Sequence, residues 1–140
     1  MLDDLPREEV LAAVDRTVAS LGLTHAQYVL LASLYGMERA GRRPTQRELA
    51  DHTGLEALYA SKLARALDVG GLIRRDRDPG DTRAIRLALT DRGREVVRPA
   101  INEVSKLLDR LMAPLGGRGD PRAKAFAQDL ATLLDAPLDP

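Results

Sequence analysis

The stretch TQRELADHTGL at 45–55 constrains the fold of this chain more than any other part of its sequence. Thr45 and Glu48 have the spacing of a capping box, in which each side chain accepts a hydrogen bond from the backbone amide of the other residue. This signal predicts a short helix over 46–52. A second helix is predicted from about 56 to 70, where two consecutive glycines stop it. Two short helices joined by a brief turn that contains glycine are typical of a helix-turn-helix.

Residues 74–90, RRDRDPGDTRAIRLALT, follow this pair of helices and predict a β-hairpin. Leu72-Ile73 leads the first strand, and the Asp, Pro and Gly residues of 78–82 are typical of a tight turn. The second strand is predicted over 83–89, where the apolar residues alternate: Ile85, Leu87 and Leu89. We therefore expect a five-residue loop and a hairpin that packs on the core through one face only. A helix-turn-helix followed by a hairpin is the winged-helix plan, in which the second helix can enter a DNA groove.

Helical periodicity covers most of the remaining chain. Apolar residues recur at helical spacing over 7–21, and Thr24 can cap a helix that runs to about residue 40. Thr90 can cap a long helix that reaches about Leu115, and a last helix is predicted over 121–135. The predicted fold class is therefore mainly α (α+β), a winged helix-turn-helix with a two-stranded wing and with N- and C-terminal dimerisation helices.

The long helix after Thr90 carries an apolar stripe with alternating spacings of four and three, close to the seam of a coiled coil: Val97, Ile101, Val104, Leu108 and Leu111. We expect this stripe and the last helix to bury little within a small winged-helix core. They can pair with the same helices of a second subunit or pack back on their own chain, and the residues alone leave both options open. If the helices pair between subunits, the chain divides into three parts. Residues 1–22 and 93–140 form the dimerisation helices, and residues 23–92 form the winged helix-turn-helix that binds DNA.

The chain has no formal net charge, but its charges are unevenly distributed. Residues 39–98 carry 14 Lys and Arg against 9 Asp and Glu, and the rest of the chain has the opposite excess. Five arginines lie within 74–86 alone. A basic centre between acidic ends indicates a central anion-binding surface, with chance clustering of solvated charge as the alternative.

The predicted helix over 56–70 has two distinct faces. The side that we expect to face the core is apolar: Ala60, Leu63, Ala64 and Leu67. The opposite side carries candidate DNA contacts: Ala57, Leu58, Ser61, Lys62 and Arg65. Lys62 and Ser61 can reach phosphates or base edges, and Ala57 or Leu58 can touch a thymine methyl. An ordinary amphipathic surface helix is the alternative for this segment alone, and the basic hairpin beside it favours DNA.

The arginines of the hairpin have too few acidic neighbours to balance them, so an external anion is expected among them. Asp81 precedes Arg83 by two residues and can hold its guanidinium in one orientation. Such an arginine loses less entropy when it enters a narrow groove of negative potential. The other arginines of the hairpin are expected to attract an anion less specifically: Arg74, Arg75, Arg77 and Arg86. Two of them, Arg75 and Arg77, are also candidate DNA contacts.

Several classes of function are not expected for this chain. It has no cysteine, which excludes disulfides, thiolate metal sites and thiol switches. Neither a nucleotide-binding loop nor a metal motif is present, and His25 and His52 fall at predicted helix ends. We therefore expect no enzyme activity, no cofactor and no metal. No apolar stretch approaches about 20 residues and the N-terminus is acidic, so we expect a cytoplasmic protein without a membrane partner.

Three segments together resemble the MarR family of bacterial transcriptional regulators: LTHAQYVLLASL (23–34), TQRELADHTGL (45–55) and SKLARALDVGGLIRRDRDPGDTRAIRLALTDRG (61–93). The Asp-x-Arg of the hairpin followed by Leu-Thr-x-x-Gly is the most specific part. The resemblance implies a homodimer that binds a palindromic double-stranded DNA operator, more often as a repressor than as an activator. The expected DNA contacts are Thr45, Gln46, Arg47, Ala57, Leu58, Ser61, Lys62, Arg65, Arg75, Arg77, Asp81 and Arg83.

By the same resemblance, a small phenolic or lipophilic ligand would bind in a cleft between the dimer helices and the winged helix. Its binding would release the protein from DNA. Four side chains can line that cleft, with the arginine as partner of an anion: Arg16, His25, Tyr28 and Tyr35. The two tyrosines also lie on a helix that is expected to be buried, so a core role is the alternative. The alternative function is a winged-helix module that binds proteins without binding DNA, in which Leu58 and Tyr59 would be contact residues.

Overall fold

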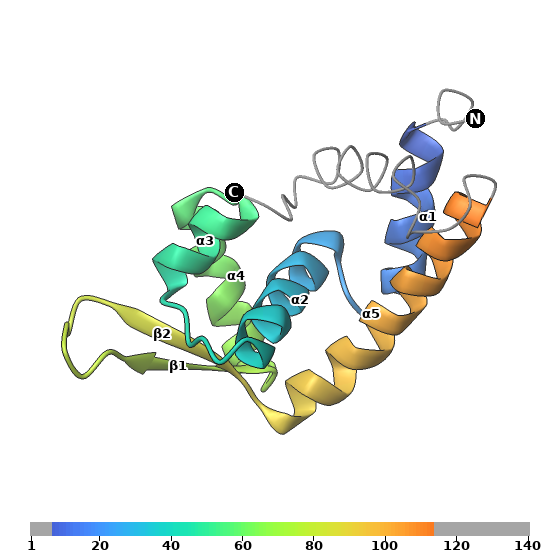
Figure 1. Cartoon of the computed structure of the whole chain (residues 1–140). Coiled ribbons are helices and arrows are strands. Elements are labelled where there is room, and N and C mark those ends of the chain that lie inside the picture. The colour runs from blue at the N-terminus through green and yellow to red at the C-terminus, as the bar shows by residue number, and fades with distance from the viewer. Residues whose placement is uncertain (1–6, 114–140) are drawn as a thin grey trace.

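The computed structural model describes residues 7–113, which form five helices and a two-stranded antiparallel sheet (Figure 1). In chain order the elements are α1 (Arg7–Ala19), α2 (His25–Arg39), α3 (Gln46–Thr53), α4 (Ala57–Val69), β1 (Ile73–Arg77), β2 (Ile85–Leu89) and α5 (Asp91–Met112). The sheet projects beyond the helices at one end of the fold, and α1 lies beside α5 at the other. The predicted winged helix-turn-helix with a two-stranded wing is confirmed. No helix in the described range has the length and apolar character needed to cross a membrane.

Threonine side chains start three of the helices. Thr45 Oγ1 accepts the amide of Glu48 at 3.0 Å, and the Glu48 carboxylate accepts the amide of Thr45 at 2.9 Å, which confirms the predicted capping box. Thr24 and Thr90 cap α2 and α5 through the same kind of bond. At the other end of α3, Gly54 has a φ of 77°, in the left-handed region that glycine adopts without a steric cost. The chain can therefore turn sharply from α3 into α4.

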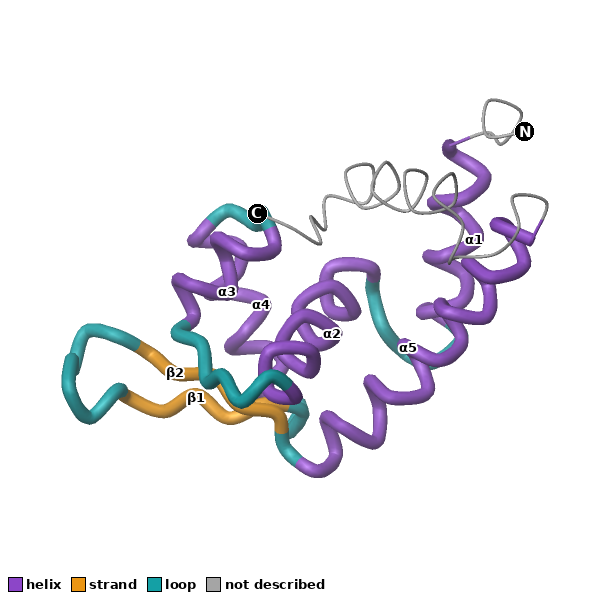
Figure 2. Tube along the Cα trace, in the orientation of Figure 1, coloured by secondary structure: helices purple, strands orange, loops and turns teal. Residues whose placement is uncertain are grey.

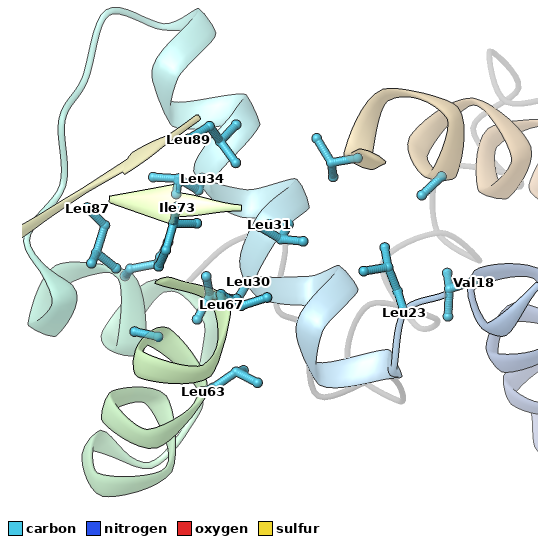
Figure 3. Close-up of a cluster of buried hydrophobic side chains, with 14 of the residues drawn as sticks. Val18, Leu23, Leu30, Leu31, Leu34, Leu63, Leu67, Ile73, Leu87 and Leu89 are labelled. Atoms are coloured by element: carbon cyan, nitrogen blue, oxygen red, sulfur yellow. The ribbon is translucent and has the colours of Figure 1, made fainter. Parts of the chain in front are cut away.

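One apolar cluster holds α4 and the sheet against α2 (Figure 3). The predicted inner side of α4 is buried at all four positions, so its opposite side is left to solvent. Burying each large apolar side chain contributes roughly 1.5–3 kcal/mol before entropy costs. The cluster therefore keeps α4 and the sheet in a defined relative position. Its members from α2, α4 and the strands include Leu30, Leu31, Leu34, Leu63, Leu67, Ile73, Leu87 and Leu89.

The apolar side of α5 differs from the predicted stripe. Its buried positions are Val97, Ala100, Val104 and Leu107, whereas the other three stripe residues are only partly buried: Ile101, Leu108 and Leu111. Because α1 and α2 both pack against α5, the expectation that the stripe buries little within its own chain is wrong for Val97 and Val104. The predicted end of this helix at Leu115 and the predicted helix over 121–135 lie outside the described residues.

The hairpin differs from the prediction in two respects. Its second strand begins at Ile85 instead of Arg83, because residues 82–84 belong to the turn, where the amide of Ala84 donates to the Asp81 carbonyl at 2.9 Å. The loop is therefore longer than the predicted five residues. The hairpin is also covered on both faces near its base, because Ala88 is buried on the face opposite to that of Leu87 and Leu89. The free edge of β2 is covered as well, since the amide of Leu87 donates to the Pro44 carbonyl at 3.0 Å.

Candidate nucleic-acid interface

Three separate elements pack against one another at one end of the fold: α3, α4 and the wing (Figure 2). A groove of about 610 Å³ lies between the start of α3 and the wing tip. It brings five of the predicted site residues together, with three neighbours: Thr45, Gln46, Arg47, Asp81 and Arg83, beside Glu48, Ala84 and Ile85. The two segments are nearly forty positions apart in the sequence, and only the fold joins them.

The outer side of α4 is exposed and mixed in character. Lys62 and Arg65 are exposed on it, and the Leu58 side chain at its first turn is 60% exposed. Ser61 is half-buried, and its hydroxyl lies 3.5 Å from an Arg65 guanidinium nitrogen. Ala57 is exposed at the N-terminus of the helix. A helix with such a face can present cations and small or apolar groups to a groove at the same time.

The wing tip holds one arginine away from the protein surface. The Arg83 side chain is 93% exposed, although its backbone amide donates to Asp81 Oδ1 at 3.0 Å and its Nε lies 3.6 Å from the same oxygen. Arg77 braces the loop from the other strand by donating to the Thr82 carbonyl at 2.7 Å. Asp81 thus orients the arginine through backbone and side chain together, and the guanidinium still faces solvent.

Arg86 has a structural role that the sequence did not suggest. Its Nε donates to Asp78 Oδ1 at 2.8 Å, and its Nη1 donates to the carbonyl of Arg43. The same guanidinium lies 3.7 Å from the Glu48 carboxylate, and the backbone of Arg86 pairs with that of Thr45. The expectation of unspecific attraction is therefore wrong for Arg86, since its charge is used to join the wing to the segment that precedes α3.

Arg75 is less exposed than the other arginines among the predicted DNA contacts. The strand register places it opposite Leu87, on the face of the sheet that carries Ile73. The residue is half-buried, and its Nε is buried without a hydrogen-bond partner among the described residues. Arg74 points to the other face, where its Nε lies 3.8 Å from Asp76. The register thus separates neighbouring arginines that look equivalent in the sequence.

The ion pair of Asp78 and Arg86 makes the stability of the fold pH-dependent. The hydrogen bond from Arg86 lowers the pKa of Asp78, so the pair stabilises the fold above the unfolded-state pKa of about 3.9 and is lost as the pH falls through the lower folded value. We expect Arg86→Met to lower Tm near pH 6 and the gap to wild type to narrow towards about pH 3. Thermal melts across this range test it, with exposed Arg92→Met as the control. A gap that stays constant with pH would contradict the assignment.

The four predicted ligand-binding residues fall into separate places. His25 Nδ1 lies 3.2 Å from Asp15 of α1, and Arg16 is exposed beside that aspartate. Burial raises the pKa of Tyr28 to about 12. Tyr35 lies ten residues after His25, about 15 Å further along the helix. Its hydroxyl accepts hydrogen bonds from two arginines, which lower its pKa: Arg98 at 3.2 Å and Arg39 at 3.3 Å. A cleft lined by all four residues would therefore have to run along most of the length of α2.

The fold, with α3, α4 and the wing packed against one another, defines a winged helix-turn-helix protein. The family model described as MarR family matches residues 21–84. The transcriptional repressor CouR, solved bound to a 23-mer DNA duplex, is 32% identical and superposes with a TM-score of 0.72, over 89% of this chain and 84% of that one. The chain belongs to the MarR family.

Two further relatives extend this comparison. YdcH of Bacillus subtilis (strain 168), an uncharacterized HTH-type transcriptional regulator, is 36% identical over 94 residues. That match spans 67% of this chain and 64% of the length of YdcH. The PcaV transcriptional regulator from Streptomyces coelicolor, solved with its natural ligand, is 25% identical with a TM-score of 0.69, over 94% of this chain and 92% of that one. All are described as regulators, in agreement with the prediction that the chain is not an enzyme.

Proposed function

We propose that the chain binds double-stranded DNA as a homodimer and represses transcription from a palindromic operator in the cytoplasm. The observation that carries this proposal is the packing of α3, α4 and the wing against one another at one end of the fold. In this arrangement α4 would enter the major groove, and Thr45, Gln46 and Arg47 would hold the phosphate backbone. Arg83 would enter the adjacent minor groove. The relative CouR, a repressor solved on DNA, supports the proposal.

The experiment is a titration of duplexes from the promoter region of the chain's own gene. A regulator of this kind is expected to bind one duplex far more tightly than unrelated DNA of equal length. Binding of all duplexes with equal affinity, or of none at low salt, would contradict DNA regulation. It would favour the second candidate, a protein-interaction module, for which the exposed Leu58 and Tyr59 are the supporting observation.

Arg83→Ala is expected to weaken operator binding by at least about tenfold, because one charge-assisted contact contributes roughly 1.5–3 kcal/mol. Since this side chain is 93% exposed, its loss should leave folding unchanged. Fluorescence anisotropy with the operator measures the affinity. Sedimentation of the same variant should give the mass of wild type, which we expect to be that of a dimer. Unchanged affinity would remove Arg83 from the interface.

The proposed dimer uses the terminal segments 1–22 and 93–140, and 23–92 forms the DNA-binding part. The partly buried residues of α5 support this division: Ile101, Leu108 and Leu111 remain at the margin of the core of one chain. A monomer mass at micromolar concentration would contradict it.

The proposed effector is a small phenolic or lipophilic molecule with an anionic group, which Arg16 would bind beside His25 and Tyr28. The ligand-bound structure of PcaV supports a ligand of some kind for this chain. We expect phenolic acids to release labelled operator from the wild-type protein but not from Arg16→Ala. Equal release from both proteins would place the ligand elsewhere.

A further inference from the structure

Exposed large apolar side chains are rare on the described part of the chain. Among residues 8–111, for which the burial of the side chains is described, only three have them: Leu58 at 60% exposure, Tyr59 at 47% and Val69 at 90%. Two of the three are adjacent, at the N-terminus of α4. Leu58 lies opposite the buried side of that helix, so it cannot be turned into the core. Exposed apolar groups that lie together on a soluble domain commonly mark a contact surface.

The surroundings of this apolar pair are cationic. Lys62 and Arg65 follow Leu58 on the same side of α4, about one and two turns further along, and both are exposed. Arg47 is exposed at the start of α3, and Arg83 stands out from the wing tip. A partner that fits this surface must therefore combine a dense negative charge with a small apolar group.

Duplex DNA offers this combination. Its phosphates supply the negative charge, and in its major groove the C5-methyl of thymine is the apolar group that the base edges present. Helix-turn-helix proteins contact base edges with the N-terminal residues of their second helix, where Leu58 lies. An apolar protein surface would satisfy Leu58 and leave Lys62 and Arg65 without counter-charges.

We propose that Leu58 is a specificity-determining residue that buries a thymine methyl in each half-site of the operator. Ala57 has a small side chain, which permits close approach of the first turn to the base edges. Tyr59 lies around the helix from Leu58 and closes the site on one flank. The inference rests on the proposed function, because it names the base that the same helix reads.

The test replaces single thymines of the operator with deoxyuridine, which removes the methyl group and keeps the base pairing. At one position per half-site, we expect the substitution to weaken wild-type binding about fourfold, and about 15-fold when both half-sites carry it. Leu58→Ala should bind the thymine operator more weakly and should lose no further affinity on the deoxyuridine operator. Such non-additivity identifies a direct contact.

Val69→Ala is the matched control, because Val69 is exposed on the same side of α4 about 16 Å from Leu58. This variant should keep wild-type affinity and full sensitivity to deoxyuridine. Insensitivity of wild type to every deoxyuridine, or full sensitivity in Leu58→Ala, would overturn the inference while leaving DNA regulation intact. Wild-type affinity in Leu58→Ala would assign the apolar pair to a protein partner. The absence of any preferred duplex would overturn both proposals.

Discussion

Operator affinity is expected to fall by roughly three to five orders of magnitude when the salt concentration rises from 50 to 200 mM. Each subunit of the proposed dimer offers five basic side chains on α3, α4 and the wing: Arg47, Lys62, Arg65, Arg77 and Arg83. A dimer that uses roughly six to ten such groups on phosphates releases a similar number of counterions, so its affinity depends steeply on salt. Anisotropy titrations at four or more salt concentrations measure the slope, expected to be about −0.9 per phosphate contact on logarithmic axes.

The salt dependence of single variants shows how much each side chain contributes to this slope. Lys62→Ala should lower its magnitude by about 1.8 in a dimer, since one phosphate contact is lost from each subunit. Arg110→Ala removes an exposed arginine from the far end of α5 and should leave the slope unchanged. A wild-type slope near zero would show that the basic surface does not contact phosphates.

Gly93→Ala is expected to destabilise the fold by about 1–3 kcal/mol, the cost of forcing an extra methyl group into a packed site. Gly93 is buried in the first turn of α5, where an added Cβ would overlap the backbone carbonyl of Leu72. The same Cβ would lie 3.2 Å from the Leu89 side chain. The Leu72 carbonyl cannot withdraw easily, because it also accepts the amide of Thr90. Urea unfolding followed by circular dichroism measures the change.

Gly36→Ala is the matched control for this substitution. Gly36 is an exposed residue within α2, and an added Cβ there meets nothing within 4 Å. Alanine favours a helix by roughly 0.8–1 kcal/mol over glycine, so this variant should be more stable than wild type. Equal stability of Gly93→Ala and wild type would mean that α5 can move away from β1 without cost.

Local signals predicted the parts of the fold that local interactions determine. The capping box of Thr45 and Glu48, the caps at Thr24 and Thr90 and the glycine after α3 each depend on residues within one turn, and each has the expected geometry. The inner side of α4 was also predictable, because helical periodicity alone selects it. The pairing of Asp81 with Arg83 spans two residues and was visible for the same reason.

The features that the sequence did not reveal depend on distant parts of the chain. Arg86 joins Asp78 and the Arg43 carbonyl, eight and 43 residues away, and no periodic signal connects these positions. Ala100 and Leu107 are buried because α1 and α2 approach α5 from a side that spacing within one helix cannot specify. The start of β2 was misplaced because alternation continues into residues that side-chain and carbonyl bonds hold in a turn.

The junction between Arg86 and the segment before α3 has a mechanical consequence. The Arg86 side chain, the pairing of its backbone with Thr45, and the bond from Leu87 to Pro44 join the wing and the start of α3 into one body. A rotation of α5 would act on that body as a lever, because β2 leads directly into α5 through Thr90. Under the proposed function, the phosphate contacts at the start of α3 and the minor-groove contact of Arg83 would then be lost in a single step. DNA dissociation without an intermediate that is bound by the wing alone is the expected kinetic signature of this junction.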